Sequence, residues 1–454
     1  MNKKHQPTGP TRLPKEWIDW LTRPFSRFMR VEAGAGAMLL LATVAALVLS
    51  NSPAARHVDA FWETPMGLRW GAIELIRPLR GWINDALMTL FFFLVALELK
   101  RELVLGELRK PRVAALSIAG ALGGMLVPAG LYLLLQSGRP GAAGWGTVMA
   151  TDTAFVSGCL ALLGERIPKR LRVFMLSLAI VDDIGAVLVV AIGYSHAIAW
   201  LPLALAALGL VVIRALAWAG LRSLPFYFTV GAMVWIAVDA SGVHATVAGV
   251  ILGLMTPARP WVSADRLYAI LRQVVAHPAA ERGSGATRDR ETLQVAEIAA
   301  RETLSPVERL ELGLHPWVAF LIMPLFAFAN AGLSLSSEHL GGPIAWAVFV
   351  GFAVGKPMGV FAFSWLAVRL GIATRPPDLD WRMLAGGGLL AGIGFTMAMF
   401  IANLAFKESE LASAKLGIFL ASGCSGLAGL VLLWTIQGRR RQRPTRRGVE
   451  LMIP

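Results

Sequence analysis

Two adjacent carboxylates stand inside an apolar stretch of the sequence, LAIVDDIGAVLVVAIGY, which covers residues 178–194. They are Asp182 and Asp183, and an ionised carboxylate at the centre of a membrane helix costs roughly 2.5 to 3.5 kcal/mol. Asp152 and Lys356 lie in two further apolar runs and carry a similar cost. Ionisable residues in such runs face a bundle interior or a wet cavity, and they mark ion paths and proton relays.

The charge balance among these four groups indicates a site for a cation. A buried ion pair that only fixes helix register would account for Lys356 with one aspartate, and it leaves two carboxylates without a countercharge. Neighbouring residues on a helix point about 100° apart, so Asp182 and Asp183 do not both face one ligand. One of them can pair with Lys356 while the other faces a cavity opposite Asp152. Facing carboxylates hold either protons or a small hard cation, and this competition is the physical basis of exchange.

The composition places these groups in a membrane. Of 454 residues, 56% are hydrophobic and 16% are charged, and the mean hydropathy is +0.60, whereas a soluble domain carries about a quarter charged residues. The apolar runs are long enough to cross roughly 30 Å of hydrocarbon. We therefore predict an all-α polytopic membrane protein. Its twelve expected spans are 33–50, 84–103, 112–136, 145–164, 171–197, 199–218, 224–240, 243–257, 316–335, 343–369, 383–406 and 413–436.

Lys and Arg residues predict the orientation of the chain. Alternate loops are rich in them, and the loop at 51–83 breaks the trend with four arginines. The basic tails at 1–32 and 437–454 fall on the same side as the rich loops, so we expect both termini to be cytoplasmic. Trp17 and Trp20 stand among arginines in the first tail and predict a short interfacial helix there.

The net charge of +14 is explained by residues that flank the spans. Since no nucleic-acid motif accompanies them, we expect anionic lipid headgroups at the cytoplasmic face as partners, and no nucleic acid. The polar segment 258–315 contains eight basic and eight acidic residues. Its amphipathic second half predicts a short cytoplasmic helix in a linker between two membrane halves.

Glycines predict breaks in two of the spans. The span of Thr151 and Asp152 contains Gly146 and Gly158, and the span 383–406 contains GGGLLAGIGFTMAMF. Unwound backbone can serve an ion through its carbonyls and helix ends. Close helix packing through small residues, as in GALGG at 120–124, would explain glycines equally well.

Motifs of soluble enzymes are absent or incomplete. GFAVGKP has Val350 in place of the first glycine of a phosphate loop, and Pro357 in place of Ser or Thr. No zinc-binding His–Glu helix and no GxSxG elbow occurs. We therefore expect no enzymatic activity.

Six motifs closely resemble the NhaA family of bacterial sodium/proton antiporters: ATDTAF, LAIVDDIGA, GVHATVAGV, LHPWVAFLIMPLFAFANAG, GKPMGV and GIGFTMAMFIANLAF. The resemblance runs from about residue 30 to 435. It implies twelve transmembrane helices in inverted-topology repeats, with two crossed, discontinuous helices at Thr151–Asp152 and Gly392–Phe395. It also implies electrogenic exchange of Na⁺ or Li⁺ for protons in the bacterial inner membrane, with these ions as substrates and no cofactor.

The resemblance assigns roles to individual residues. Asp152 and Asp183, with Thr151, are implied to bind the ion, and Asp182 is implied to be the partner of Lys356. A second set matches the family's pH-sensing residues. It consists of Glu98, Arg101, Glu102, His244 and Glu311. Charges are also ordinary at a helix end on the membrane surface, so a sensing role and a plain interfacial role both stay open.

Three further segments bear on assembly and regulation, and two alternative functions stay open. The stretch FWETPMGLRWGAIELI (61–76) resembles the family's dimer-forming hairpin and implies a homodimer, while the residues alone suggest a short extended pair. The insert at 258–304 and the basic C-terminal tail look longer than the family usually has, which bears on regulation more than on the ion site. A proton-coupled symporter of another small solute and a proton-gated channel or sensor are the alternative functions.

Overall fold

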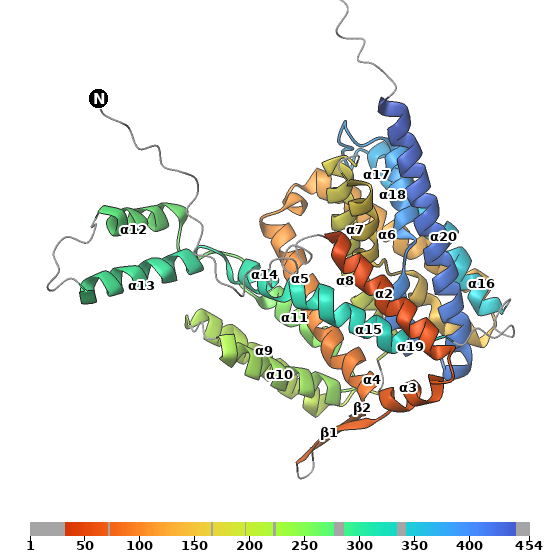
Figure 1. Ribbon diagram of the computed structural model, residues 1–454, viewed down its shortest axis with the longest axis horizontal. Coiled ribbons are helices and arrows are strands. Elements are labelled where there is room, and N and C mark those ends of the chain that lie inside the picture. Colours follow the sequence, from red (N-terminus) through yellow and green to blue (C-terminus); the bar gives the residue numbers. More distant parts are fainter. Residues whose placement is uncertain are drawn as a thin grey trace, which may run out of the picture.

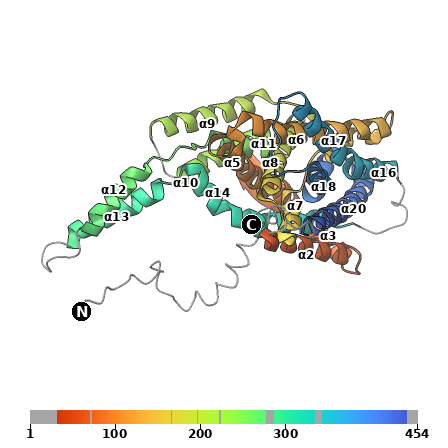
Figure 2. The same cartoon turned by 90° about the horizontal axis from the view of Figure 1, so that it is seen from above.

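The computed structural model describes residues 32–70, 73–164, 167–195, 197–220, 224–276, 286–333 and 342–441. The expected interfacial helix of the N-terminal tail and the end of the C-terminal tail lie outside these ranges. The described chain is mainly helical (Figures 1 and 2).

The elements follow one another from α2 to α20. The first half holds α2 (Glu32–Ser50), α3 (Ala55–Trp62), β1 (Pro65–Trp70), β2 (Ile73–Pro78), α4 (Leu79–Trp82), α5 (Met88–Val104), α6 (Pro111–Leu135), α7 (Thr153–Leu162), α8 (Lys169–Gly193) and α9 (Trp200–Trp218). The second half holds α10 (Leu224–Ala240), α11 (Thr246–Met255), α12 (Ala264–Ala276), α13 (Ala286–Glu302), α14 (Pro306–Trp317), α15 (Met323–Asn330), α16 (Pro343–Val350), α17 (Lys356–Arg369), α18 (Trp381–Ala391), α19 (Phe395–Ala405) and α20 (Glu408–Arg441).

Seven helices of the described chain are long and apolar enough to cross a membrane, and two bent pairs raise the number to nine. The pair of α2 and α3 bends by 118°, and the pair of α18 and α19 bends by 45°. Three shorter apolar helices cover Thr153–Leu162, Pro225–Ala240 and Thr246–Met255. Each of the twelve expected spans therefore contains a helix, and length and composition support seven to nine crossings.

The outer surface of the bundle is apolar. Ile192 is 84% exposed, Leu134 is 76% exposed and Trp200 is 75% exposed. Large apolar side chains over such an extended surface mark contact with lipid rather than water. The fold thus has two apolar environments, its own core and the surrounding membrane.

Helices α12 and α13 project away from the bundle (Figures 1 and 2). They occupy the polar segment 258–315, in which one short helix was expected, and the structure has these two before α14 begins at Pro306. The pair of α9 and α10 lies to one side and has a small core of its own with α11. Its buried members are Ala206, Ile213, Val234, Val238 and Ala248.

A two-stranded antiparallel hairpin, β1 with β2, leads from α3 into α4. Pro65 faces Pro78 at its open end, and Met66 faces Arg77. Proline has no N–H to donate, so the ladder ends where the two prolines stand. The short extended pair that the sequence suggested is confirmed, and its end of the bundle is called the hairpin end below.

Helices α6 and α17 touch through their backbones. A Cβ atom on Gly123 would lie 2.1 Å from the carbonyl oxygen of Gly359, and one on Gly359 would lie 2.0 Å from that of Gly123. One position further along α6, a Cβ on Gly124 would lie 3.8 Å from Cε of Lys356. Close packing through GALGG is therefore confirmed, and it sets the position of Lys356.

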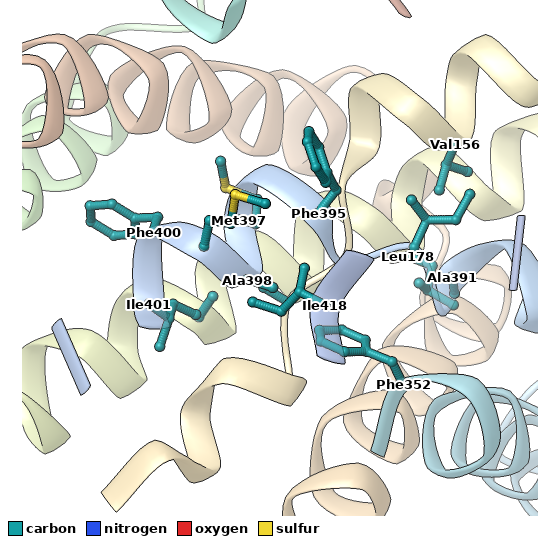
Figure 3. Close-up of a cluster of buried hydrophobic side chains, with 14 of the residues drawn as sticks. Val156, Leu178, Phe352, Ala391, Phe395, Met397, Ala398, Phe400, Ile401 and Ile418 are labelled. Atoms are coloured by element: carbon teal, nitrogen blue, oxygen red, sulfur yellow. The ribbon is translucent and has the colours of Figure 1, made fainter. Parts of the chain in front are cut away.

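Helix α19 is buried on all sides. Its residues from Phe395 to Ala402 are all shielded from solvent. Figure 3 shows Phe395, Met397 and Phe400 projecting from it among buried side chains that include Phe352 of the neighbouring π-helical turn, Gly351–Gly355. A helix that is apolar all round belongs in the centre of a bundle.

The α6–α17 contact predicts the effect of a single added methyl group. Gly123→Ala should lower the free energy of unfolding by about 1 to 3 kcal/mol, because overpacking forces the two backbones apart. Gly130→Ala on the same helix is the control, since nothing lies within 4 Å of a Cβ there. Thermal unfolding in detergent measures both. Equal melting temperatures for the two variants would contradict the proposed contact.

Candidate functional site

Two breaks in the helices meet in the bundle centre. The first lies between a 3₁₀ helix, Pro140–Val148, and the start of α7. The second lies between α18 and α19. The N–H of Asp152 donates to the carbonyl of Ile393 over 2.7 Å, and the hydroxyl of Thr151 lies 3.1 Å from the carbonyl oxygen of Ala391. Each break thus supplies partners for backbone groups that the other leaves free, and both predicted breaks are confirmed.

Phe352 packs against the second break and requires its glycines. A Cβ on Gly394 would lie 2.2 Å from Cζ of Phe352, and one on Gly392 would lie 2.8 Å from the Phe352 carbonyl oxygen. Any larger residue at either position would push the ring or the backbone away. Glycine therefore serves here to let the chain approach closely as well as to interrupt a helix.

Asp152 lies at the N-termini of two helices. It caps α7 by accepting a hydrogen bond from the N–H of Phe155 at 3.1 Å. It also accepts hydrogen bonds from the N–H of Thr396 in α19, at 2.9 Å, and from the hydroxyl of Thr396. The N-terminal ends of helices carry partial positive charge, so both favour an ionised carboxylate at this fully buried position.

Lys356 and Asp182 form the predicted ion pair. Their Nζ and Oδ2 atoms lie 2.7 Å apart, and both side chains are completely buried. Lys356 also donates to the carbonyl of Met149, and the hydroxyl of Thr151 donates to Asp182. Thr151 was expected beside Asp152 and Asp183, but its side chain serves the ion pair. The reason is local geometry, because neighbouring residues of an extended segment point to opposite sides.

Asp183 has the fewest partners of the three aspartates. Its Oδ2 accepts a hydrogen bond from the hydroxyl of Thr153 at 3.1 Å, and its Oδ1 has no hydrogen-bond partner in the described chain. Thr153 is the first residue of α7, directly after Asp152, so α7 starts between the two carboxylates. Asp183 is 2% exposed. It is the most open acceptor for a proton or a cation in the site.

The buried charges do not balance. Three carboxylates and one lysine leave an excess of two negative charges when all are ionised, and each of the four residues is 2% exposed or less. Uncompensated charge in an apolar interior is expensive. Two protons would remove this excess, and one small monovalent cation held by carboxylate, hydroxyl and carbonyl oxygens would halve it, since hard cations prefer oxygen ligands.

The comparison with known families agrees with this chemistry. The family model described as Na⁺/H⁺ antiporter 1 matches residues 26–433. The chain belongs to this antiporter family. It is 61% identical over 421 residues to an Na⁺/H⁺ antiporter NhaA of Acidiphilium cryptum (strain JF-5), covering 93% of this chain and 94% of the relative. It is 55% identical over 443 residues to one of Vibrio vulnificus (strain CMCP6), covering 98% and 99%. A third, from Rhizobium meliloti (strain 1021), is 56% identical, covering 95% of this chain and 99% of the relative.

Four of the five residues that the antiporter resemblance implied in pH sensing lie together. Arg101 donates to Glu311 and, over 3.4 Å, to Glu102. Glu98 lies within electrostatic range of these three groups and also of Asp183. This acidic cluster joins α5 to α14.

His244 lies apart from that cluster. Its Nδ1 is 2.8 Å from the hydroxyl of Thr246, and its Nε2 is 3.9 Å from Asp85. Asp85 and Glu98 are thirteen residues apart on one helical span, which is about 20 Å. The five residues therefore form two sites at different depths, because His244 precedes α11 at the hairpin end.

Sequence reasoning missed several partners of the site. Thr396 donates hydrogen bonds to Asp152, and Thr153 donates one to Asp183. The sequence feature that could have indicated them is their position next to the breaks.

Sequence reasoning also missed a network at the hairpin end, where Arg77 forms ion pairs with Asp85 and Asp239. Asp85 and Asp239 both lie near the ends of expected spans. Charged residues are common there, so their presence does not by itself indicate a functional network.

The ion pair predicts a cost that a second substitution should offset. Lys356→Met should lower the free energy of unfolding by about 3 to 5 kcal/mol, because it leaves Asp182 buried without a partner. In the double variant Lys356→Met/Asp182→Leu most of this loss should return, since no lone charge remains. Thermal unfolding of the wild type and both variants in detergent measures this. A single variant as stable as the wild type would contradict the pairing.

Proposed function

We propose that the protein exchanges Na⁺ or Li⁺ for protons across the bacterial cytoplasmic membrane. The observation that carries this proposal is the excess negative charge at the meeting point of the two breaks. Protons and the cation compete for this site, since both bind to the same carboxylates. The names of the relatives, all Na⁺/H⁺ antiporters, support the same activity. They do not favour a symporter or a proton-gated channel.

Asp152 and Asp183 are the proposed ion-binding carboxylates. In the proton-loaded form both are neutral, and in the cation-loaded form their oxygens, helped by nearby hydroxyls and carbonyls, hold one monovalent ion. When one such ion replaces two protons, one net charge crosses the membrane in each cycle. Exchange is then electrogenic, and alternating access carries the same site from one side to the other.

Asp182 and Lys356 are proposed to couple the site to its backbone. Lys356 contacts the carbonyl of Met149 at the first break, and Asp182 accepts from Thr151, whose hydroxyl is also near the second break. A change in the charge of this pair therefore acts on both breaks. In this role the pair transmits protonation to helix position without contacting the cation.

The finer architecture is part of the proposal. We propose twelve transmembrane helices in two inverted repeats, with the two broken helices crossing at their breaks and both termini in the cytoplasm. The helix found in every expected span and the hydrogen bonds between the breaks support this arrangement. The bias of Lys and Arg toward alternate loops supports the orientation.

A homodimer through the hairpin is also proposed. β1 and β2 reach beyond the helices (Figure 1), and Met66 and Ile76 are 59% and 45% exposed. Unpaired strand edges and exposed apolar side chains are the features that a second copy would cover. Anionic lipids are the proposed partners of the basic loops.

Competition at the ion site is the proposed main source of pH dependence, and a pH-sensing role of the acidic cluster, together with His244 at the hairpin end, is the alternative. A negative charge on Glu98 would disfavour ionisation of Asp183, which supports such a role. A sensor of this kind changes the fraction of active protein. It differs from competition at the ion site, where acid changes only the occupancy.

Asp152→Asn and Asp183→Asn should each abolish Na⁺-driven proton movement and leave the protein in the membrane. Each removes a carboxylate that must alternate between proton and cation. The measurement is the loss of an imposed pH gradient in vesicles after Na⁺ is added. Asp378→Asn, at an exposed position, is the matched control. Exchange at the wild-type rate in either site variant would show that the site is wrongly assigned.

Competition predicts how exchange depends on pH. Acid should raise the apparent Michaelis constant for Na⁺ and leave the maximal rate nearly constant, because saturating Na⁺ recovers every protonated site. The measurement is Na⁺ titration of exchange at several pH values, in the wild type and in Glu98→Ala. A maximal rate that collapses with acid in the wild type and recovers in Glu98→Ala would instead identify a separate sensor.

A further inference from the structure

Helix α20 packs along both halves of the broken helix, α18 and α19. Two of its serines, Ser422 and Ser425, reach the break between them. Residues three apart on a helix lie on the same face, so α20 presents both hydroxyls to the break side by side. Neither residue belongs to the set that the sequence motifs indicated.

Ser422 holds the start of α19. Its hydroxyl oxygen accepts a hydrogen bond from the N–H of Phe395 at 3.3 Å. This N–H is one of those that every helix N-terminus leaves without a partner inside the helix. The next residue, Thr396, donates its N–H and its hydroxyl to Asp152. Adjacent amides of α19 are therefore held by Ser422 and by the candidate ion-binding carboxylate.

Ser425 faces the end of α18. It is 2% exposed, and its hydroxyl has no hydrogen-bond partner in the described chain. A Cβ on Gly392 would lie 2.7 Å from this hydroxyl oxygen, so only the absence of a side chain there lets the two approach. A buried hydroxyl without a partner destabilises the conformation that contains it. In this conformation the Ser425 hydroxyl makes no hydrogen bond within the described chain.

We propose that Ser422 and Ser425 are positioning residues for the ion site and act through the backbone of the break. Ser422 sets the start of α19 so that both donors of Thr396 reach Asp152 in the conformation seen here. Ser425 serves the alternate conformation, in which the break shifts along α20 and a backbone group reaches the second hydroxyl. This inference rests on the proposed role of Asp152 in binding the ion.

The first test concerns Ser422. In full-length protein reconstituted in vesicles, Ser422→Ala should raise the apparent Michaelis constant for Na⁺ by about fivefold to tenfold, the effect of one lost hydrogen bond, with little change in maximal rate. Ser422→Thr keeps the hydroxyl and should restore the wild-type constant. Ser409→Ala, at an exposed position of α20, is the control. An unchanged constant in Ser422→Ala, or one that Ser422→Thr fails to restore, overturns the role of Ser422.

The second test concerns Ser425. Ser425→Ala should raise the melting temperature, because it removes an unpaired buried hydroxyl, and should lower the maximal rate of exchange, because the alternate conformation loses its partner. A residue that only fills space would change stability and rate in the same direction or change neither. Either of those results overturns the role of Ser425.

Asp152→Asn in the same assay separates this inference from the function on which it rests. If Asp152→Asn exchanges normally, the assigned ion site is wrong. If Asp152→Asn is inactive while the serine variants behave as the wild type, the ion site stands and only the positioning roles fail.

Discussion

A carboxylate enclosed in an apolar medium needs a counterion, a proton or several hydrogen-bond donors. The three aspartates of the site combine these differently. Asp182 has a lysine and a hydroxyl, and Asp152 has two helix ends and a hydroxyl. Asp183 has one hydroxyl. The fixed partners therefore do not balance the three carboxylates, and a bound proton or cation would stabilise the site. The rest of the fold contributes hydrogen-bond donors to the carboxylates, and Lys356 is the one positively charged side chain that pairs with them in the described chain.

The breaks depend on one another for the same reason. Free backbone groups inside a membrane must find partners within the protein, because lipid offers none. Here the N–H of Asp152 meets the carbonyl of Ile393, and Thr396 donates to the carboxylate of Asp152. Moving either break alone would leave polar groups unpaired on both. Any change in the charge of Asp152 would therefore affect α7 and α19 together.

Much of this arrangement could be predicted from sequence, because ionisable residues and glycines in apolar runs are conspicuous. The position of the spans and a buried pair of Lys356 with one of the two adjacent aspartates follow from charge, length and helix geometry. The choice of Asp182 as the partner came from the resemblance to the NhaA family, and the glycines alone left breaks and close packing equally open. The contact of the Thr151 side chain with Asp182 could not be predicted. It depends on the backbone conformation at the break, which the amino-acid composition does not reveal. The separation of His244 from Glu98 depends on tertiary packing, and residues with one implied role need not share one place.

The backbone contact between Gly123 and Gly359 has a consequence for motion. No side chain lies between α6 and α17 at this point, so neither helix can slide past the other without its main chain colliding. The two form a rigid unit, and Lys356 travels with it. Any relative displacement of helices would therefore occur along other boundaries of the bundle. Lys356 would then keep its place against α6 during any such displacement, and its ion pair with Asp182 would be loaded from the side of α8.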